Sequence, residues 1–428
     1  MKLELPRCLL LLAGSLLAVP AHSQQVWTVD SQGPLKTIQA AVDLAGNGDV
    51  ILVRPGTYAP FDVVAKSLTI VGDPAAEVSL FAIFPPGIPF DRALEIRQLA
   101  ADQRVVLRGI DFRIAVLDPL PTVELAGNAG SVLFEDCEIQ GSVGAAVSVG
   151  GSQSVTFVRC RLAAGGPFLS AGSSVFQTAA GLQALNSNVY LFESDVRGSQ
   201  GKDWVLISPT TSAGGPGLAL KSGFVLAQGS SLQGGRGGQV GPVGFQPCIP
   251  LQAGGAGAVL EETLGSARLV LLSSDLSGGP GGQPVAGCPE LPGPTGPAQV
   301  VLGGQLQSFG AEARAFGWSG LVREGQSAEL FLAGQPGDQA LLFVAASGSP
   351  GSFLEPALLA PHLELGSLVL LPLPALPASG VLASALTAPN LPAGVQVRAL
   401  CAQALFLASN GELFLSGPSE LRLLDAAL

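Results

Sequence analysis

An eight-residue pattern recurs six times between residues 105 and 276, and it limits the possible folds more than any other feature of the sequence. In each window the first, third and eighth residues are apolar, with Ala227 the weakest case, and the seventh is polar. The alternation has a period of two residues, is interrupted at positions four and five, and then resumes. It predicts a strand, a bend and a second short strand that turn one face towards a core. The windows are VVLRGIDF (105–112), VLFEDCEI (132–139), VTFVRCRL (155–162), VYLFESDV (189–196), VLAQGSSL (225–232) and LVLLSSDL (269–276).

The spacing of the windows indicates how the repeats are assembled. Successive windows begin 27, 23, 34, 36 and 44 residues apart, so the core segments persist while the connecting loops change length. A second apolar segment precedes most windows, for example at 121–125, 145–149 and 217–220. Repeats of this kind predict a parallel β-solenoid whose coils stack about 4.8 Å apart. A β-sandwich of hairpins is the alternative, but we favour the solenoid because the windows recur in one orientation.

Residues 37–72 sharpen the prediction. Thr37–Ala45 is a short helix with a capping Thr and apolar residues spaced three and four apart. Two apolar segments follow, Gly48–Tyr58 and Lys66–Gly72. This arrangement resembles the N-terminal cap and first coils of secreted right-handed parallel β-helix proteins, the group that includes pectin methylesterases and pectate-lyase-like proteins. The resemblance spans residues 26–306 and implies a right-handed parallel β-helix with a short N-terminal capping helix.

The pattern changes after about Gly310, where strands separated by Gly, Pro and Ser turns replace the long loops. These strands predict a small C-terminal β-sandwich-like module, which resembles the tail module of many secreted repeat proteins of environmental bacteria. The predicted organisation is a signal peptide at 1–23, a β-helix domain at 24–308 and the C-terminal module at 309–428. The predicted strands of the module are 325–332, 339–344, 395–400, 404–407 and 412–415.

The N-terminus has the features of an export signal. Lys2 and Arg7 accompany an apolar core at Cys8–Val19, and Ala21–Ser23 carries small residues at the two cleavage-site positions. We predict a protein secreted to the medium or the cell surface, with the periplasm as an alternative. The stretch 365–397 has no charge but is interrupted by five prolines. It predicts short buried strands, so no membrane span is expected after signal cleavage.

Composition excludes several classes of function. The chain has 21 Lys and Arg against 32 Asp and Glu, a formal net charge of −11, whereas nucleic-acid binding needs clustered basic residues. His22 and His362 are the only histidines, and no Cys/His spacing is typical of zinc. We therefore predict no nucleic-acid partner, no metal and no cofactor.

The resemblance to pectin methylesterases implies a site of two aspartates and an arginine, one Asp acting as acid/base and the other as nucleophile. Residues 157–160 resemble the Phe-Tyr-Arg-Cys strand of that family, and Gly56–Tyr58 resembles its early Gly-x-Tyr motif. The downstream Gln-Asp-Thr-Leu and Asp-Phe-Ile-Phe-Gly motifs are missing. The Asn-Thr-Asp and Asp-Asp motifs of polygalacturonases and the Arg-x-Pro-x-x-Arg run of pectate lyases are missing too. Because mechanism follows site residues and not fold, these absences argue against an esterase.

The seventh positions of the windows would stack on one outer face of a solenoid. Such a row of carboxylates could bind Ca²⁺ or a cationic glycan, or support a lyase reaction with the arginine nearby. We favour a simpler explanation, in which outward positions are polar because they face water and alternating signs relieve repulsion. In the loop beyond, Trp204 could stack a sugar or plug the loop against the solenoid. The candidate glycan or ion face comprises Asp111, Glu138, Arg161, Asp195, Arg197, Lys202, Asp203, Trp204 and Asp275.

Two glycine-rich loops follow the windows, at Gly234–Gln239 and Gly278–Gln283. A calcium roll would carry Asp near Gln239 and Gln283, and a phosphate cradle needs a Lys after the glycines, so neither is predicted. We interpret them as tight or flexible loops that leave the solenoid.

The cysteines beyond the signal are Cys137, Cys160, Cys248, Cys288 and Cys401. Export permits disulfides, and Cys248 and Cys288 lie in equivalent loops of neighbouring coils, so a disulfide between them is predicted. Cys137 and Cys160 would stack in the core with their Cβ atoms rather far apart, which favours a reduced pair. Cys401 is left over and is predicted to be buried.

These observations favour a secreted or cell-surface β-helix protein without catalytic activity, with a structural or glycan-binding role. Its predicted partner is an extracellular polysaccharide or a cell-surface component. The alternative is a polysaccharide lyase or hydrolase with a site of unfamiliar composition on the solenoid face. Convergence of Asp195, Arg197, Lys202 and Asp203 in one groove would favour the enzyme.

Overall fold

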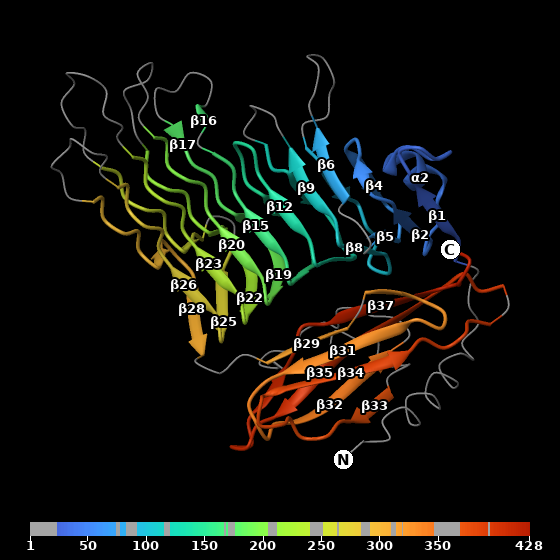
Figure 1. Cartoon of the computed structure of the whole chain (residues 1–428). Coiled ribbons are helices and arrows are strands. Elements are labelled where there is room, and N and C mark those ends of the chain that lie inside the picture. Colours follow the sequence, from blue (N-terminus) through green and yellow to red (C-terminus); the bar gives the residue numbers. More distant parts are fainter. Residues whose placement is uncertain are drawn as a thin grey trace.

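Three parallel sheets wind around one long core and form a right-handed parallel β-helix, which confirms the predicted fold (Figure 1). The predicted signal peptide lies outside the described residues. The computed structural model describes residues 24–73, 78–82, 92–114, 120–166, 168–169, 176–203, 212–239, 251–262, 265–283, 292–309, 314–318, 320–345, 369–392 and 394–428.

Each coil contributes one strand to each sheet. Sheet 1 consists of β1 (Val26–Val29), β2 (Val50–Val53), β5 (Leu68–Gly72), β8 (Arg104–Arg108), β11 (Ser131–Glu135), β14 (Ser154–Val158), β19 (Ser187–Phe192), β22 (Gly223–Gln228), β25 (Ala267–Leu272) and β28 (Gln305–Phe309). Sheet 2 consists of β3 (Gly56–Thr57), β6 (Val78–Ala82), β9 (Asp111–Ile114), β12 (Glu138–Gln140), β15 (Arg161–Ala163), β20 (Asp195–Arg197), β23 (Ser231–Gln233) and β26 (Asp275–Ser277). Sheet 3 consists of β4 (Phe61–Val64), β7 (Leu94–Arg97), β10 (Val123–Ala126), β13 (Val147–Gly150), β18 (Leu182–Leu185), β21 (Leu218–Leu220), β24 (Ala258–Leu260) and β27 (Gln299–Val301). A short antiparallel pair, β16 (Phe168–Leu169) and β17 (Phe176–Gln177), lies outside the coils.

The repeated window is the corner between sheets 1 and 2. The fifth residue of every window has a positive φ, for example 54° at Asp136 and 51° at Glu193. This left-handed residue turns the chain from one sheet to the next and interrupts the alternation at that point. The predicted strand, bend and strand are therefore confirmed.

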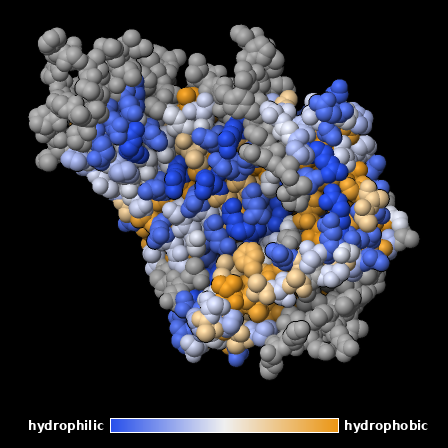
Figure 2. All heavy atoms as spheres, in the orientation of Figure 1, coloured by the Kyte–Doolittle hydropathy of each residue, from blue (hydrophilic) through white to orange (hydrophobic). Residues whose placement is uncertain are grey.

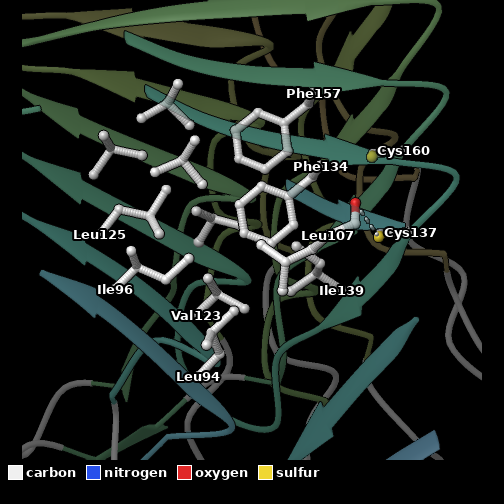
Figure 3. Packing of buried hydrophobic residues seen from close by; sticks show 14 of the residues in the cluster. Leu94, Ile96, Leu107, Val123, Leu125, Phe134, Cys137, Ile139, Phe157 and Cys160 are labelled. Carbon is white, nitrogen blue, oxygen red and sulfur yellow. Dashed lines mark hydrogen bonds between the residues drawn. The ribbon is translucent and has the colours of Figure 1, made fainter. Parts of the chain in front are cut away.

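Identical positions of successive coils stack as ladders in the core (Figure 3). Phe134 and Phe157 stack with ring centroids 5.0 Å apart. Further along, serines replace apolar residues, and the backbone N–H of Ser194 donates to Ser230 Oγ at 3.1 Å. The Ser194 hydroxyl in turn donates to the Phe192 carbonyl at 2.8 Å, so these buried hydroxyls have partners.

The predicted helix is α2 (Ile38–Leu44), and it begins as expected at Thr37, whose Oγ1 accepts a hydrogen bond from Ala40 N at 3.2 Å. Its buried residues join the core of the first coils. Lys66 Nζ donates to the carbonyls of Val42 and Ala45 at 2.6 and 2.9 Å, which fixes the other end of the helix.

The C-terminal module consists of two facing sheets around a second core, as predicted. No helix in the described part of the chain has the length and hydropathy to cross a membrane. The charge-free stretch 365–397 contains β33 (Val369–Pro372) and β34 (Val381–Thr387), but Leu370 and Val381 are half exposed, so these strands are only partly buried. One sheet has β29 (Ala315–Trp318), β31 (Ser327–Ala333) and β34 (Val381–Thr387), and the other has β30 (Leu321–Arg323), β37 (Ser419–Leu424), β35 (Val397–Leu407), β32 (Gln339–Ala345), β33 (Val369–Pro372) and β36 (Leu413–Leu415).

The module contacts the outer face of sheet 1 (Figure 1). Glu135 is completely buried there and accepts hydrogen bonds from Arg108 Nη1 at 2.8 Å, Arg159 Nη2 at 2.6 Å and Ser419 Oγ at 2.6 Å. Burial raises the pKa of Glu420, but the charges of Arg422 and Arg104 outweigh it and the net pKa is lowered. Sheet 1 is thus occupied where the module docks, and sheets 2 and 3 remain as candidate binding faces.

Candidate functional site

The predicted polar ladder exists and runs along sheet 2. Strand register pairs Asp111 with Glu138, Glu138 with Arg161, and Arg161 with Asp195. It continues through Ser231 to Asp275. Each residue opens its strand and alternates with a buried apolar neighbour, so its side chain faces outwards. The space-filling view is mostly hydrophilic over these strands (Figure 2).

The ladder is accompanied by a second outward row two residues further along each strand. Arg113 in this row lies between two acidic residues of the ladder, 3.9 Å from Asp111 Oδ2 and 3.5 Å from Glu138 Oε1. Arg161 lies between Glu138 and Asp195 in the register. The face therefore combines positively charged hydrogen-bond donors with negatively charged acceptors. The second row consists of Arg113, Gln140, Ala163, Arg197, Gln233 and Ser277.

The loop residues Lys202 and Asp203 have contacts within the neighbouring loop segments. Asp203 contacts Arg236 Nη2 at 3.1 Å and accepts from Gln239 N at 2.8 Å, whereas Asp195 and Arg197 belong to β20. The backbone N–H of Lys202 donates to Ser212 Oγ at 2.7 Å. Trp204 lies outside the described residues. These contacts of Asp203 connect the segment that follows β20 with the segment that follows β23.

The glycine-rich segments pack as a bundle beside the ladder. We call the segments 198–203, 212–217, 234–239, 251–257, 278–283 and 292–298 the glycine bundle. A column of backbone hydrogen bonds, each 2.8 Å long, crosses the bundle. Its members in order are Ser199, Gly215, Gly235, Gly255, Gly279 and Gly296, and the N–H of each glycine donates to the carbonyl of the member before it in this order. Of the two interpretations, tight loops and flexible loops, the structure favours tight loops for these residues, because their backbones are hydrogen-bonded to one another and about half of the residues are buried.

Close approach explains why the bundle needs glycine. A Cβ atom on Gly255 would lie 2.0 Å from the carbonyl oxygen of Gly215, and one on Gly235 would lie 1.7 Å from that of Ser199. These glycines do not have a positive φ, so space and not backbone conformation excludes other residues. Glycines at 234, 235, 237 and 238 recur every three residues, the period of a polyproline II helix.

A second candidate site, absent from the sequence-based prediction, lies on the outer face of sheet 3. Strand register stacks Asp62, Glu95 and Glu124 on successive coils. Arg92 contacts Glu124, and Arg97 Nε lies 3.5 Å from Glu95 Oε1. Burial and the charge of Glu95 raise the pKa of Asp62, against the opposing effect of Arg97 and Arg92. The shared position of the three acids in the segments FDVV, LEIR and VELA is the signal that could have revealed this column.

The described cysteines are buried free thiols, as predicted for Cys137, Cys160 and Cys401. Figure 3 shows Cys137 and Cys160 on neighbouring coils, with the Cys137 thiol donating to the Leu107 carbonyl at 3.6 Å. Cys248 and Cys288 lie outside the described residues, so their disulfide stays a prediction. Among the residues that the structure describes, no group of three or more His, Cys, Asp and Glu could hold a metal ion.

Solved structures with a similar fold include two proteins with distant sequences. The enzymatically active domain of tailspike protein 4 from bacteriophage CBA120 matches 90% of this chain at 11% identity and a TM-score of 0.30, and this chain spans 65% of that domain. Pectin methylesterase from Aspergillus niger matches 68% of this chain and 87% of its own length, at 14% identity and a TM-score of 0.22. No protein-family model and no curated protein matches this sequence. The three parallel sheets themselves make this chain a right-handed parallel β-helix repeat protein.

Proposed function

We propose that this protein is secreted or displayed at a cell surface, and that it binds an extracellular polysaccharide on the outer face of sheet 2 without cleaving it. The observation that carries the proposal is the ladder of polar residues in register from Asp111 to Asp275. Neighbouring strands lie about 4.8 Å apart, so the ladder repeats hydrogen-bonding groups along a line. An extended polysaccharide repeats its hydroxyl groups along a line as well, and therefore suits a row better than a closed pocket.

The balance of charge on this face supports an uncharged or weakly charged polymer. Arg161 lies between the acidic Glu138 and Asp195 along the ladder. Arg113 of the second row lies 3.9 Å from Asp111 Oδ2 and 3.5 Å from Glu138 Oε1. Ion-paired carboxylates keep acceptor capacity for hydroxyl groups because each oxygen has more than one lone pair. The arginine partners hold these carboxylates in place.

Mobility of the full chain in native gels that contain candidate polysaccharides tests the proposal. We expect retardation by at least one polymer, and Arg161→Ala and Asp195→Ala to weaken that binding about tenfold each, or about 1.4 kcal/mol. Arg97→Ala on sheet 3 is the matched control and should bind as the wild type does. Polymer length, followed by size exclusion, should stay constant; a fall in length would contradict a non-catalytic role.

A second candidate function is cleavage of a polysaccharide at the acidic column of sheet 3. The observation that favours it is the raised pKa of Asp62 beside Glu95, because a general acid needs a carboxyl group that keeps its proton. In this case Asp62→Asn would abolish the shortening of the polymer while Arg161→Ala would not. The same polymers and the same size-exclusion assay distinguish the two functions.

A further inference from the structure

The two ends of the β-helix differ in whether a further element covers the terminal coil. Helix α2 covers the first coils, and its buried residues extend the core. At the other end β26, β27 and β28 are the last strands of their sheets. Within the described residues each of these strands pairs with one neighbour only. With respect to the described residues, their outer edges therefore present backbone N–H and C=O groups that no strand pairs with.

Positions that face the core elsewhere are uncovered on this last coil. Val301 is 45% exposed, whereas Leu260, its register partner on the preceding coil, is 0% exposed. Gln299 is exposed too, although its partner Ala258 is fully buried. Leu302 beside them is 69% exposed. The end of the core is thus open and bordered by apolar side chains.

The last coil also lacks the usual protection of a sheet edge. Residues 292–309 contain no charged residue, in a chain whose net charge is −11. Protected edges carry charges, prolines or bulges. Pro292, Pro294 and Pro297 occur in the last segment of the glycine bundle, but β27 and β28 contain neither proline nor charge. The nearby charges of Glu262, Arg268 and Asp275 belong to the preceding coil, and Asp275 lies on the edge strand β26. Arg268 Nη2 donates to Gln307 Oε1 of β28 at 3.0 Å.

We propose that this end of the β-helix is the interface of a two-fold dimer, in which the last coil of one copy meets the last coil of a second copy. A two-fold axis sets β28 antiparallel to β28 of the other copy, so each edge supplies the donors and acceptors that the other needs. The absence of charge favours a second copy as the occupant. Two molecules of net charge −11 repel each other by most approaches. The edge strands β27 and β28 carry no charge and β26 carries only Asp275, so the repulsion is small at this end.

The mass of the full chain in solution, measured by light scattering on a sizing column, tests this proposal. We expect twice the chain mass, and the monomer mass for Val301→Lys combined with Leu302→Lys, because the two lysines place like charges opposite each other across the axis. Leu44→Lys is the matched control: Leu44 is 57% exposed at the opposite, capped end, and this variant should stay dimeric. Circular dichroism establishes that each variant is folded.

Hydrogen exchange on the wild-type chain gives a second measurement that needs no variant. Amides of β27 and β28 should exchange more slowly as the concentration of the chain is raised. A wild-type chain that is monomeric up to its solubility limit would overturn the proposal. A dimer that survives the double substitution, or that leaves the exchange of these two strands unchanged, would overturn it as well.

Discussion

Glu193 shows how the stacking of coils sets the chemistry of a single residue. It occupies the left-handed bend between β19 and β20, with a φ of 51°. Burial raises its pKa to about 7, Asp136 and Glu135 raise it too, and Arg159 opposes them. Its Oε1 atom is buried and accepts no hydrogen bond from the described residues. This carboxyl group therefore titrates near neutral pH beside the docked module, where Gly417 lies against the adjacent Phe192.

Replacing Glu193 with Gln should remove part of the pH dependence of stability. The pKa of about 7 in the folded chain exceeds the ordinary value of 4.5, so the folded state binds the proton more tightly. The stabilisation is complete below pH 4.5 and is lost as the pH rises through 7. We expect Glu193→Gln to be more stable than the wild type above pH 7, by at most about 3 kcal/mol.

Urea unfolding of both chains across this pH range measures the effect. The difference between the two free energies of unfolding should widen as the pH rises and become constant above 7. A difference that does not change with pH would contradict the raised pKa of Glu193.

The sequence predicts which residues stack in the ladder of sheet 2, but it does not predict which segment covers the outer face of sheet 1. Parallel stacking carries a position from coil to coil, so the period of two was enough to align Glu138 with Arg161. The docking of the module was not predicted, although the second residues of the windows, such as Leu133 and Tyr190, are apolar or buried and point outwards. Outward apolar residues indicate a covered face, but they do not identify the segment that covers it.

At the scale of elements, the glycine bundle is the clearest difference between prediction and structure. The recurrence of glycine is local and visible in the sequence. Its reason is not local, because Gly215, Gly255 and Gly296 meet residues of other segments at backbone distance. A glycine that permits a left-handed turn and one that permits close approach look alike in one sequence. The contacts between segments are needed to tell them apart.

A pair of alanine substitutions separates these two roles. Gly255→Ala places a Cβ 2.0 Å from the Gly215 carbonyl oxygen and should cost about 1–3 kcal/mol of unfolding free energy by overpacking. At Gly150, at the end of β13, an added Cβ meets nothing within 4 Å, so Gly150→Ala should be neutral or slightly stabilising. Thermal unfolding of both variants measures the difference. Equal stability of the two variants would show that the bundle tolerates side chains.

At the scale of the whole molecule, one buried carboxylate connects the β-helix to the C-terminal module. Glu135 belongs to β11, and it contacts two arginines of the β-helix as well as Ser419 of β37. Residues separated by 284 positions thus share one hydrogen-bond network. The two parts should therefore unfold together in a single transition.

Glu135→Gln should break this connection. The substitution removes the charge that compensates Arg108 and Arg159, and loss of one partner of a buried ion pair costs about 3–5 kcal/mol. We expect a lower midpoint of urea unfolding and two resolved transitions in place of one. Asp203→Asn is the control, since it breaks an exposed pair with Arg236 that is worth about 1 kcal/mol or less. A single transition with an unchanged midpoint would show that Glu135 does not hold the module.

The glycine bundle has a consequence for behaviour in the cold. Its contacts are backbone amides and carbonyls, so its unfolding would expose polar surface, which lowers the heat capacity, while unfolding of the core exposes apolar surface, which raises it. Hydrophobic stabilisation weakens on cooling, whereas the hydrogen bonds of the bundle do not depend on it. Near the freezing point the hydrophobic core is therefore weakened more than the hydrogen bonds of the bundle. The segments of the glycine bundle should be among the last parts of the chain to loosen at low temperature.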